Sequence, residues 1–160
     1  MKILVFSDSH GHPQNMLDAY EDNKDAGMLV FLGDGGRDFE ELLAGQNIFP
    51  YGADTSVRTV MVAGNCDRRS MEPVTVIDEL GGTRFLITHG HAYNAHSGYA
   101  GLLREAREKN CGAVLFGHTH TQCHEDHDGV TLFNPGSIRS GKYGLIRITD
   151  RRVEYQLKQL

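Results

Sequence analysis

The sequence has little cysteine, and its three cysteines, Cys66, Cys111 and Cys123, have no paired spacing. A disulfide framework is therefore not expected, and the C-x-x-C pattern of a structural zinc site is absent. Cysteines this few and this scattered fit a reducing compartment. We therefore expect a cytoplasmic protein.

Long apolar runs are also lacking. No apolar stretch approaches the length that spans a bilayer, so we expect no membrane partner. The stretch that begins the chain, 3–6, is only four residues long and is ended by the polar sequence S-D-S-H. A signal peptide needs a longer apolar segment, so we interpret this stretch as the first buried strand.

Positive charge is not in excess, because the net charge is -5 with histidine neutral. The arginine pairs at 68–69 and 151–152 are short and do not form a stripe. Proteins that bind long nucleic acid usually carry a basic face, so we expect no contact with duplex nucleic acid. A small anionic substrate remains compatible with the charge, because two divalent ions would bring about +4 into a site.

The chain of 160 residues is 39% hydrophobic, which suits one domain over 1–160 with a real core. Apolar runs alternate with helical patterns in the first half, which favours parallel strands, and later hairpins favour antiparallel pairing. We predict an α/β fold, a mixed two-sheet β-sandwich flanked by helices. Expected strands are 2–6, 28–32, 57–62, 74–77, 83–88, 113–116, 130–133, 143–148 and 153–157; expected helices are 14–26, 37–44 and 97–110; expected loops are 46–56 and 124–128.

Five short motifs with metal-binding side chains directly follow expected strands. In sheets of this kind, ligands gather beyond the carboxyl ends of the strands, so the motifs are expected to meet in space. Seven donors are too many for one tetrahedral ion and about right for two ions that share a carboxylate. The donors are Asp8 and His10 in S-D-S-H, Asp34 in G-D-G-G, Asn65 in G-N-C-D, His89 in T-H-G-H, and His118 and His120 in G-H-T-H.

Each motif taken alone has an ordinary structural alternative. A Gly-Asp turn is the commoner explanation of Asp34, and a left-handed turn residue is an alternative for Asn65. The G-H-T-H motif is the most specific, because two imidazoles leaving a buried strand are awkward to pack. The turn N-P-G-S at 134–137 has two equal readings, a structural turn or one that aims backbone groups at the site. His12, His96 and the polar cluster 124–128 are expected to be loop residues rather than ligands.

The order of these motifs resembles that of the calcineurin-like metallophosphoesterase family, whose pattern is D-x-H, G-D, G-N-H-D/E, H and G-H-x-H. The match runs from 8 to 120, and the G-N-C-D variant is similar to the short bacterial and archaeal phosphodiesterases of that family. The resemblance implies two divalent metal ions, with Mn expected and Ni, Fe, Co or Zn open. It implies one ion on Asp8, His10 and His120, a second on Asn65, His89 and His118, and Asp34 bridging both.

The same resemblance implies hydrolysis of a small phosphoester by attack of a metal-bridging hydroxide on phosphorus. Many family members carry a histidine where this chain has Cys66, and in them the next acid, here Asp67, orients that histidine. His91 is a candidate substitute, so the catalytic candidates are Asp34, Asn65, Cys66, Asp67 and His91. A thiol is a poor general acid for an alkoxide, so we predict a phosphodiesterase. A phosphomonoesterase and a non-catalytic protein-interaction subunit remain alternative functions. The resemblance is also compatible with a homo-oligomer.

Overall fold

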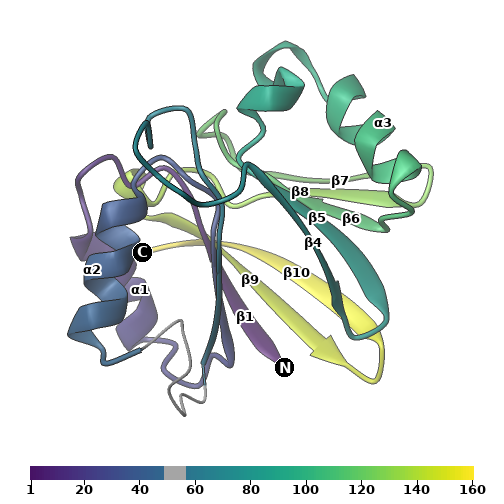
Figure 1. Ribbon diagram of the computed structural model, residues 1–160. Coiled ribbons are helices and arrows are strands. Elements are labelled where there is room, and N and C mark those ends of the chain that lie inside the picture. The colour runs from purple at the N-terminus through teal and green to yellow at the C-terminus, as the bar shows by residue number, and fades with distance from the viewer. Residues whose placement is uncertain (49–56) are drawn as a thin grey trace.

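The computed structural model describes residues 1–48 and 57–160, and two five-stranded sheets form its centre (Figure 1). The first sheet has the order β10-β9-β1-β2-β3, with β1 (Lys2–Phe6), β2 (Met28–Phe31), β3 (Arg58–Met61), β9 (Lys142–Thr149) and β10 (Arg152–Gln159). The second has the order β4-β5-β6-β8-β7, with β4 (Thr75–Leu80), β5 (Thr83–Thr88), β6 (Ala113–Leu115), β7 (Cys123–His127) and β8 (Val130–Asn134).

Each sheet is mixed, and its parallel strands carry the motifs identified in the sequence. In the first sheet β1, β2 and β3 are parallel, and in the second β5, β6 and β8 are parallel. The remaining pairs are antiparallel, including the β4–β5 and β9–β10 hairpins. The predicted two-sheet α/β sandwich is confirmed. The carboxyl ends of the parallel strands in each sheet lie at one edge, where their loops can form one site.

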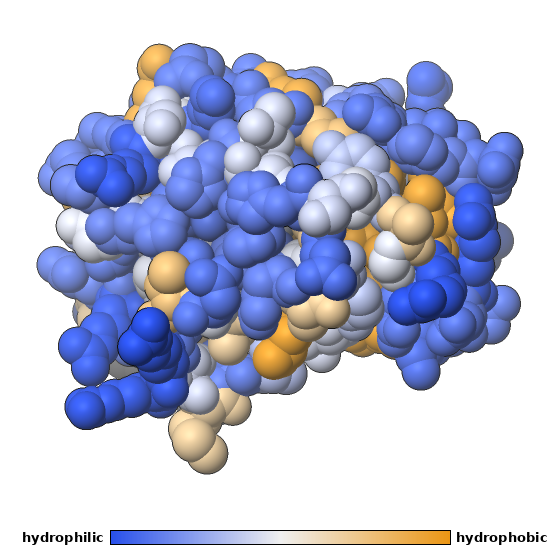
Figure 2. Space-filling model, turned by 90° about the horizontal axis from the view of Figure 1, so that it is seen from above, coloured by the Kyte–Doolittle hydropathy of each residue, from blue (hydrophilic) through white to orange (hydrophobic). Residues whose placement is uncertain are grey.

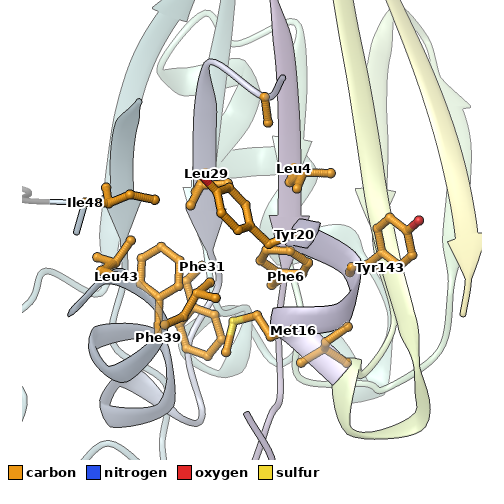
Figure 3. Packing of buried hydrophobic residues seen from close by; sticks show 14 of the residues in the cluster. Leu4, Phe6, Met16, Tyr20, Leu29, Phe31, Phe39, Leu43, Ile48 and Tyr143 are labelled. Carbon is orange, nitrogen blue, oxygen red and sulfur yellow. The ribbon is translucent and has the colours of Figure 1, made fainter. Parts of the chain in front are cut away.

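Helices cover the outer faces of both sheets. α1 (Gln14–Glu21) and α2 (Gly36–Gly45) lie on the first sheet, and α3 (Ala100–Glu108) lies on the second (Figure 1). Strand β1 is buried on both faces, which explains its continuous apolar sequence. Its Leu4 and Phe6 pack under α1 and α2, where Phe31 and Phe39 stack with ring centroids 5.2 Å apart (Figure 3).

The other face of β1 packs against the second sheet. Ile3 and Val5 join Phe85 and Ile87 of β5 in the core between the two sheets. A sandwich core of this kind fixes the two sheets relative to one another. The loops at the carboxyl ends therefore rest on a rigid base.

Several predicted boundaries differ from the observed ones. α1 ends at Glu21 rather than at residue 26, and α3 begins at Ala100 because two short 3-10 turns, His91–Tyr93 and Ala95–Ser97, precede it. The predicted loop at 124–128 is wrong, since Cys123–His127 forms the edge strand β7. Exposed charged side chains are typical of an edge strand, where they discourage pairing with other chains.

The predicted loop 46–56 falls mostly on residues 49–56, which lie outside the described residues. Across 1–48 and 57–160, no helix has the length and apolar character needed to cross a membrane.

Candidate metal centre

The predicted donors lie in loops that leave the parallel strands at one end of the molecule. Asp8 follows β1, Asp34 follows β2 and Asn65 follows β3. In the second sheet, His89 follows β5 directly, and the G-H-T-H motif follows β6. Seen from this end, the surface is mainly hydrophilic (Figure 2). Loops from both sheets thus form a polar surface at this end of the molecule.

Asp8 is the centre of the first group of donors. Its Oδ1 atom lies 3.2 Å from Nε2 of His120 and 3.7 Å from Nε2 of His10. The two imidazole Nε2 atoms are themselves 3.2 Å apart. One donor atom from each of these three residues lies within 4.8 Å of the others, which is compact enough for a single ion. The geometry therefore supports the predicted ligand set of the first ion.

His89 connects Asp8 to Asp34 in a second, fully buried group. Its Nε2 atom lies 3.4 Å from Oδ2 of Asp34 and 4.0 Å from Oδ1 of Asp8. The other ring nitrogen, Nδ1, lies 2.7 Å from the carbonyl oxygen of Leu32. When Nδ1 donates its proton to that carbonyl, the lone pair of Nε2 faces the two carboxylates. This orientation is the one that a metal-binding imidazole requires.

Two atoms in the second group are buried without a hydrogen-bond partner. They are Oδ1 of Asp8 and Nε2 of His89. An unsatisfied buried polar group costs about 1–3 kcal/mol, and more when it carries charge. Proteins therefore rarely retain such atoms without a role, and a bound ion is a common explanation. Divalent cations bound at these donors would satisfy both atoms, so the donor set fits metal ions.

The backbone at the donors is unusual. Five of the seven predicted metal ligands have positive φ, a region that costs non-glycine residues about 1–3 kcal/mol each and that clusters at functional sites. Tight loops of this kind bring Asp8 close to His10 in space. The five φ values are 57° at Asp8, 47° at His10, 60° at Asp34, 67° at His118 and 57° at His120.

Two glycines leave room for the carboxylates. A Cβ atom at Gly64 would collide with Oδ1 of Asp34, and one at Gly117 would lie 2.9 Å from Oδ2 of Asp8. Both carboxylates are thus packed directly against main chain from a neighbouring loop. Any larger side chain at either glycine would displace a donor.

Asp67 joins the loop after β2 to the loop after β3. Its Oδ2 accepts hydrogen bonds from the backbone N–H groups of Asp34 at 2.7 Å and Gly64 at 2.9 Å. Its Oδ1 accepts from Gly35 and Gly36, both at 3.0 Å. Both oxygens are therefore occupied by main chain. The contacts assign Asp67 a positioning role, and direct participation in catalysis remains a prediction.

Sequence analysis missed Asp38, which holds the S-D-S-H loop. Its Oδ2 accepts hydrogen bonds from Oγ of Ser9 at 2.5 Å and from the N–H of Gly11 at 2.8 Å. Asp38 lies in the first turn of α2 and is buried. An acidic residue on the buried side of the expected helix was the sequence feature that could have indicated its role. The helix thus fixes the backbone on both sides of His10.

The N-P-G-S turn braces two of the loops. The side-chain amide of Asn134 donates to the carbonyl of Gly117 at 2.9 Å and to Oγ1 of Thr119 at 3.0 Å. Oγ of Ser137 donates to the carbonyl of Asp8 at 2.7 Å. These contacts favour a structural turn that supports the donors through its side chains.

Local electrostatics prepare the donors for a cation. Burial alone would raise the pKa of Asp34, but His89 and the N–H of Cys66, which donates at 2.7 Å, outweigh it and hold the pKa well below its usual range. Burial lowers the pKa of His118, and His89 and His96 lower it further. The carboxylate is therefore ionised and His118 is neutral at neutral pH, as metal ligands must be.

The remaining candidates lie at the border of the buried group. His118 and His91 have ring centroids 5.0 Å and 5.3 Å from that of His89, and burial lowers the pKa of His91. Asn65 is exposed, and its side-chain nitrogen lies 3.4 Å from Sγ of Cys66. The donor atoms of Asp8, His10, Asp34, His89 and His120 fall into overlapping groups of three in which they lie within 4.8 Å of one another. Metal ligation by these residues, by Asn65 and by His118, and catalysis by His91, remain predictions.

A two-sheet sandwich with carboxylates and imidazoles gathered at its strand ends defines a metal-binding α/β protein. Residues 1–149 match the family model of the calcineurin-like phosphoesterase superfamily domain, and the chain belongs to this family. This family implies divalent metal ions, which the gathered donors can hold.

Curated relatives carry matching names. A Mycoplasma pneumoniae protein named a probable metallophosphoesterase is 30% identical over 141 residues, covering 86% of this chain and 79% of its own. A protein from Methanocaldococcus jannaschii named a phosphodiesterase is 29% identical over 149 residues, covering 85% of this chain and 83% of its own.

Solved structures share the fold. A conserved Streptococcus pneumoniae protein described as a predicted phosphoesterase superposes with a TM-score of 0.78 at 24% identity, covering 99% of this chain and 88% of its own. Vps29 from Entamoeba histolytica, solved with zinc, gives a TM-score of 0.76 at 20% identity, covering 100% and 98% of the two chains. At these identities the likeness establishes the fold alone.

Proposed function

We propose that this protein hydrolyses small phosphodiesters with the help of two divalent metal ions. The observation that carries the proposal is a pair of buried atoms without a hydrogen bond, Oδ1 of Asp8 and Nε2 of His89, which lie 4.0 Å apart. A cation between carboxylates and imidazoles is the chemistry that such atoms require. We expect manganese, and nickel, iron, cobalt and zinc also suit this donor set.

The arrangement of Asp34 supports a second ion. Its carboxylate lies within reach of Asp8 and His89 on one side, and of His10 and Cys66 on the other. In the proposal, Asp8, His10 and His120 hold one ion, Asn65, His89 and His118 hold the other, and Asp34 bridges them. Such ions supply an activated water and neutralise the phosphoryl oxygens.

Cys66 supports a diester rather than a monoester as substrate. In the metal-free protein the Asp34 carboxylate, together with burial, raises the pKa of the Cys66 thiol to about 11. An uncharged thiol cannot neutralise the extra charge of a phosphomonoester dianion as a protonated imidazole would. The relative named a phosphodiesterase points the same way.

The proposal is tested by titrating metal-stripped protein with Mn, Ni, Co, Zn and Mg. The substrates are bis(p-nitrophenyl) phosphate, an activated diester, and p-nitrophenyl phosphate, the matched monoester. We expect no turnover without metal, recovery with Mn, and faster cleavage of the diester. Faster cleavage of the monoester would make the protein a phosphatase. No turnover with any metal would favour the non-catalytic protein-interaction subunit.

Replacing Cys66 with histidine is expected to improve monoester hydrolysis relative to diester hydrolysis. Cys66 is exposed, so an imidazole can be accommodated, and it would offer an N–H to the phosphoryl or leaving-group oxygen. Because both oxygens of Asp67 are occupied by backbone N–H groups, the imidazole would be only loosely oriented. We therefore expect a gain of roughly tenfold in the monoester-to-diester ratio, at or below the low end of general acid–base effects.

The Cys66→Ala variant separates loss of the thiol from gain of the imidazole. It should leave the ratio of the two activities close to that of the original protein. An equal ratio in Cys66→His and Cys66→Ala would show that this position does not decide the substrate class.

A further inference from the structure

We propose that a pocket beside the metal centre binds a second phosphate group, so that the preferred substrates are phosphodiesters that also carry a terminal phosphate. This inference rests on the proposed function, because it places the scissile diester at the metal centre. It adds a substrate class that the metal ligands alone do not define.

The pocket has a volume of about 590 Å³ and opens directly from the donor groups. His10, Asp34 and Cys66 line its inner part. The loop after β3 and the start of α2 complete it, and they contribute Arg37, Arg68 and Arg69. A volume of this size lies within the range of small-molecule sites and exceeds what one phosphoryl group needs. The pocket can therefore hold a substrate that extends away from the metal centre.

The three arginines are exposed and have no ion-pair partner within 1–48 and 57–160. Arginine cations that are grouped in a pocket and lack a protein partner are available to an anionic ligand.

Most of the acidic groups in the same pocket are already engaged. Asp38 accepts hydrogen bonds from Ser9 and Gly11, and Asp67 accepts four from backbone N–H groups. Glu40 is the acid that remains without a partner among the described residues of the pocket. Beyond Asp34, the three arginines and three acids of the pocket balance in formal charge. Because two of these acids are held by hydrogen bonds, the exposed guanidinium groups are the ones left to bind an anionic ligand.

The chemistry of arginine favours phosphate as the second group. Its planar guanidinium donates two parallel hydrogen bonds to phosphate or carboxylate oxygens, and a phosphate dianion can accept from several guanidinium groups at once. The hydrophilic surface at this end of the molecule also favours a polar ligand over an apolar one (Figure 2). A short oligonucleotide with a terminal phosphate combines a diester monoanion with a phosphate dianion in a molecule that suits the size of the pocket.

The test compares two probes that share the same diester, the dinucleotides TpT and pTpT. Only pTpT carries a terminal 5′-phosphate. Calorimetric titration of the metal-free protein, in which no turnover is expected, measures binding alone. We expect pTpT to bind about tenfold more tightly than TpT at low salt, and this preference to fall as ionic strength rises.

Arginine variants assign the preference to the pocket. We expect Arg68→Ala and Arg69→Ala each to reduce the pTpT-to-TpT affinity ratio about threefold, and the double variant to bring it close to one. Arg68→Lys should keep part of it, because charge is retained while the bidentate geometry is lost. Arg104→Ala removes the same charge from the exposed face of α3, outside the pocket, and should leave the ratio unchanged.

The two proposals can fail separately. Equal affinity for pTpT and TpT, or a preference that survives in the double variant, would overturn the second phosphate site even when metal-dependent turnover is present. Absence of hydrolysis with any metal would reject the proposed function, while the binding ratio would still decide the inference. When both hold, the kcat/KM ratio of pTpT to TpT should follow the affinity ratio across the variants.

Discussion

Asp34→Asn is expected to abolish metal-dependent phosphodiester hydrolysis, with a loss of about 1000-fold or more in kcat. The carboxylate of Asp34 lies between the two groups of donors, and it is buried. Asparagine keeps the shape but removes the negative charge that two cations would share. Its amide also turns a donor toward Nε2 of His89 in place of one acceptor oxygen. The measurement is kcat for bis(p-nitrophenyl) phosphate with Mn, together with metal bound per chain.

Asp18→Asn provides the matched control. Asp18 is exposed on α1 and accepts a hydrogen bond from Gln14, so the same chemical change occurs far from the donors. It should leave kcat and metal content unchanged. Asp34→Asn protein that remains folded and hydrolyses the diester as fast as the original would refute the metal-dependent function. Retained turnover with only one ion lost would instead refute the bridging role.

The candidate donors could be predicted because each follows a short apolar run that is recognisable as a strand in the sequence. Short apolar runs end in S-D-S-H, G-D-G-G and G-H-T-H, and strand ends of this kind gather at one edge of a sheet. The left-handed conformation of Asp8 and His10, which brings these two donors together, is set by the tight loop and not by any periodic pattern. The sequence therefore predicted which strand ends carry the candidate donors but not the geometry of their loops.

Contacts between distant loops could not be predicted in the same way. Arg68 and Arg69 read as a short charged pair in the sequence, and only the fold brings Arg37 into the same pocket. The strand β7 was missed because its residues are nearly all polar or charged, and pairing with β8 rather than propensity makes it a strand. In the sequence, Asp67 stands beside Cys66 and was therefore predicted to be catalytic. The hydrogen bonds that it accepts come from backbone N–H groups of separate loops, which the sequence does not show to be close.

Asp67→Ala is expected to destabilise the fold and disrupt the metal centre together. Four backbone N–H groups, those of Asp34, Gly35, Gly36 and Gly64, lose their acceptor. Hydrogen bonds to a charged acceptor contribute about 1.5–3 kcal/mol each, and water can replace part of this at a half-buried carboxylate. We expect the free energy of unfolding to fall by roughly 3 kcal/mol, or about 10 °C in Tm for a domain of this size. Denaturant and thermal unfolding of metal-free protein measure the effect.

The size of the stability loss decides between a positioning and a catalytic role for Asp67. Asp126→Ala is the matched control, because Asp126 accepts one backbone hydrogen bond from Gly129 in the turn between β7 and β8. Its loss should cost about 1 kcal/mol and leave metal binding intact. If Asp67→Ala were no less stable than that control and bound metal normally, yet turned over slowly, Asp67 would act on the substrate directly. A joint loss of stability and metal binding instead follows from its position, since the loops that it joins carry Asp34 and Asn65.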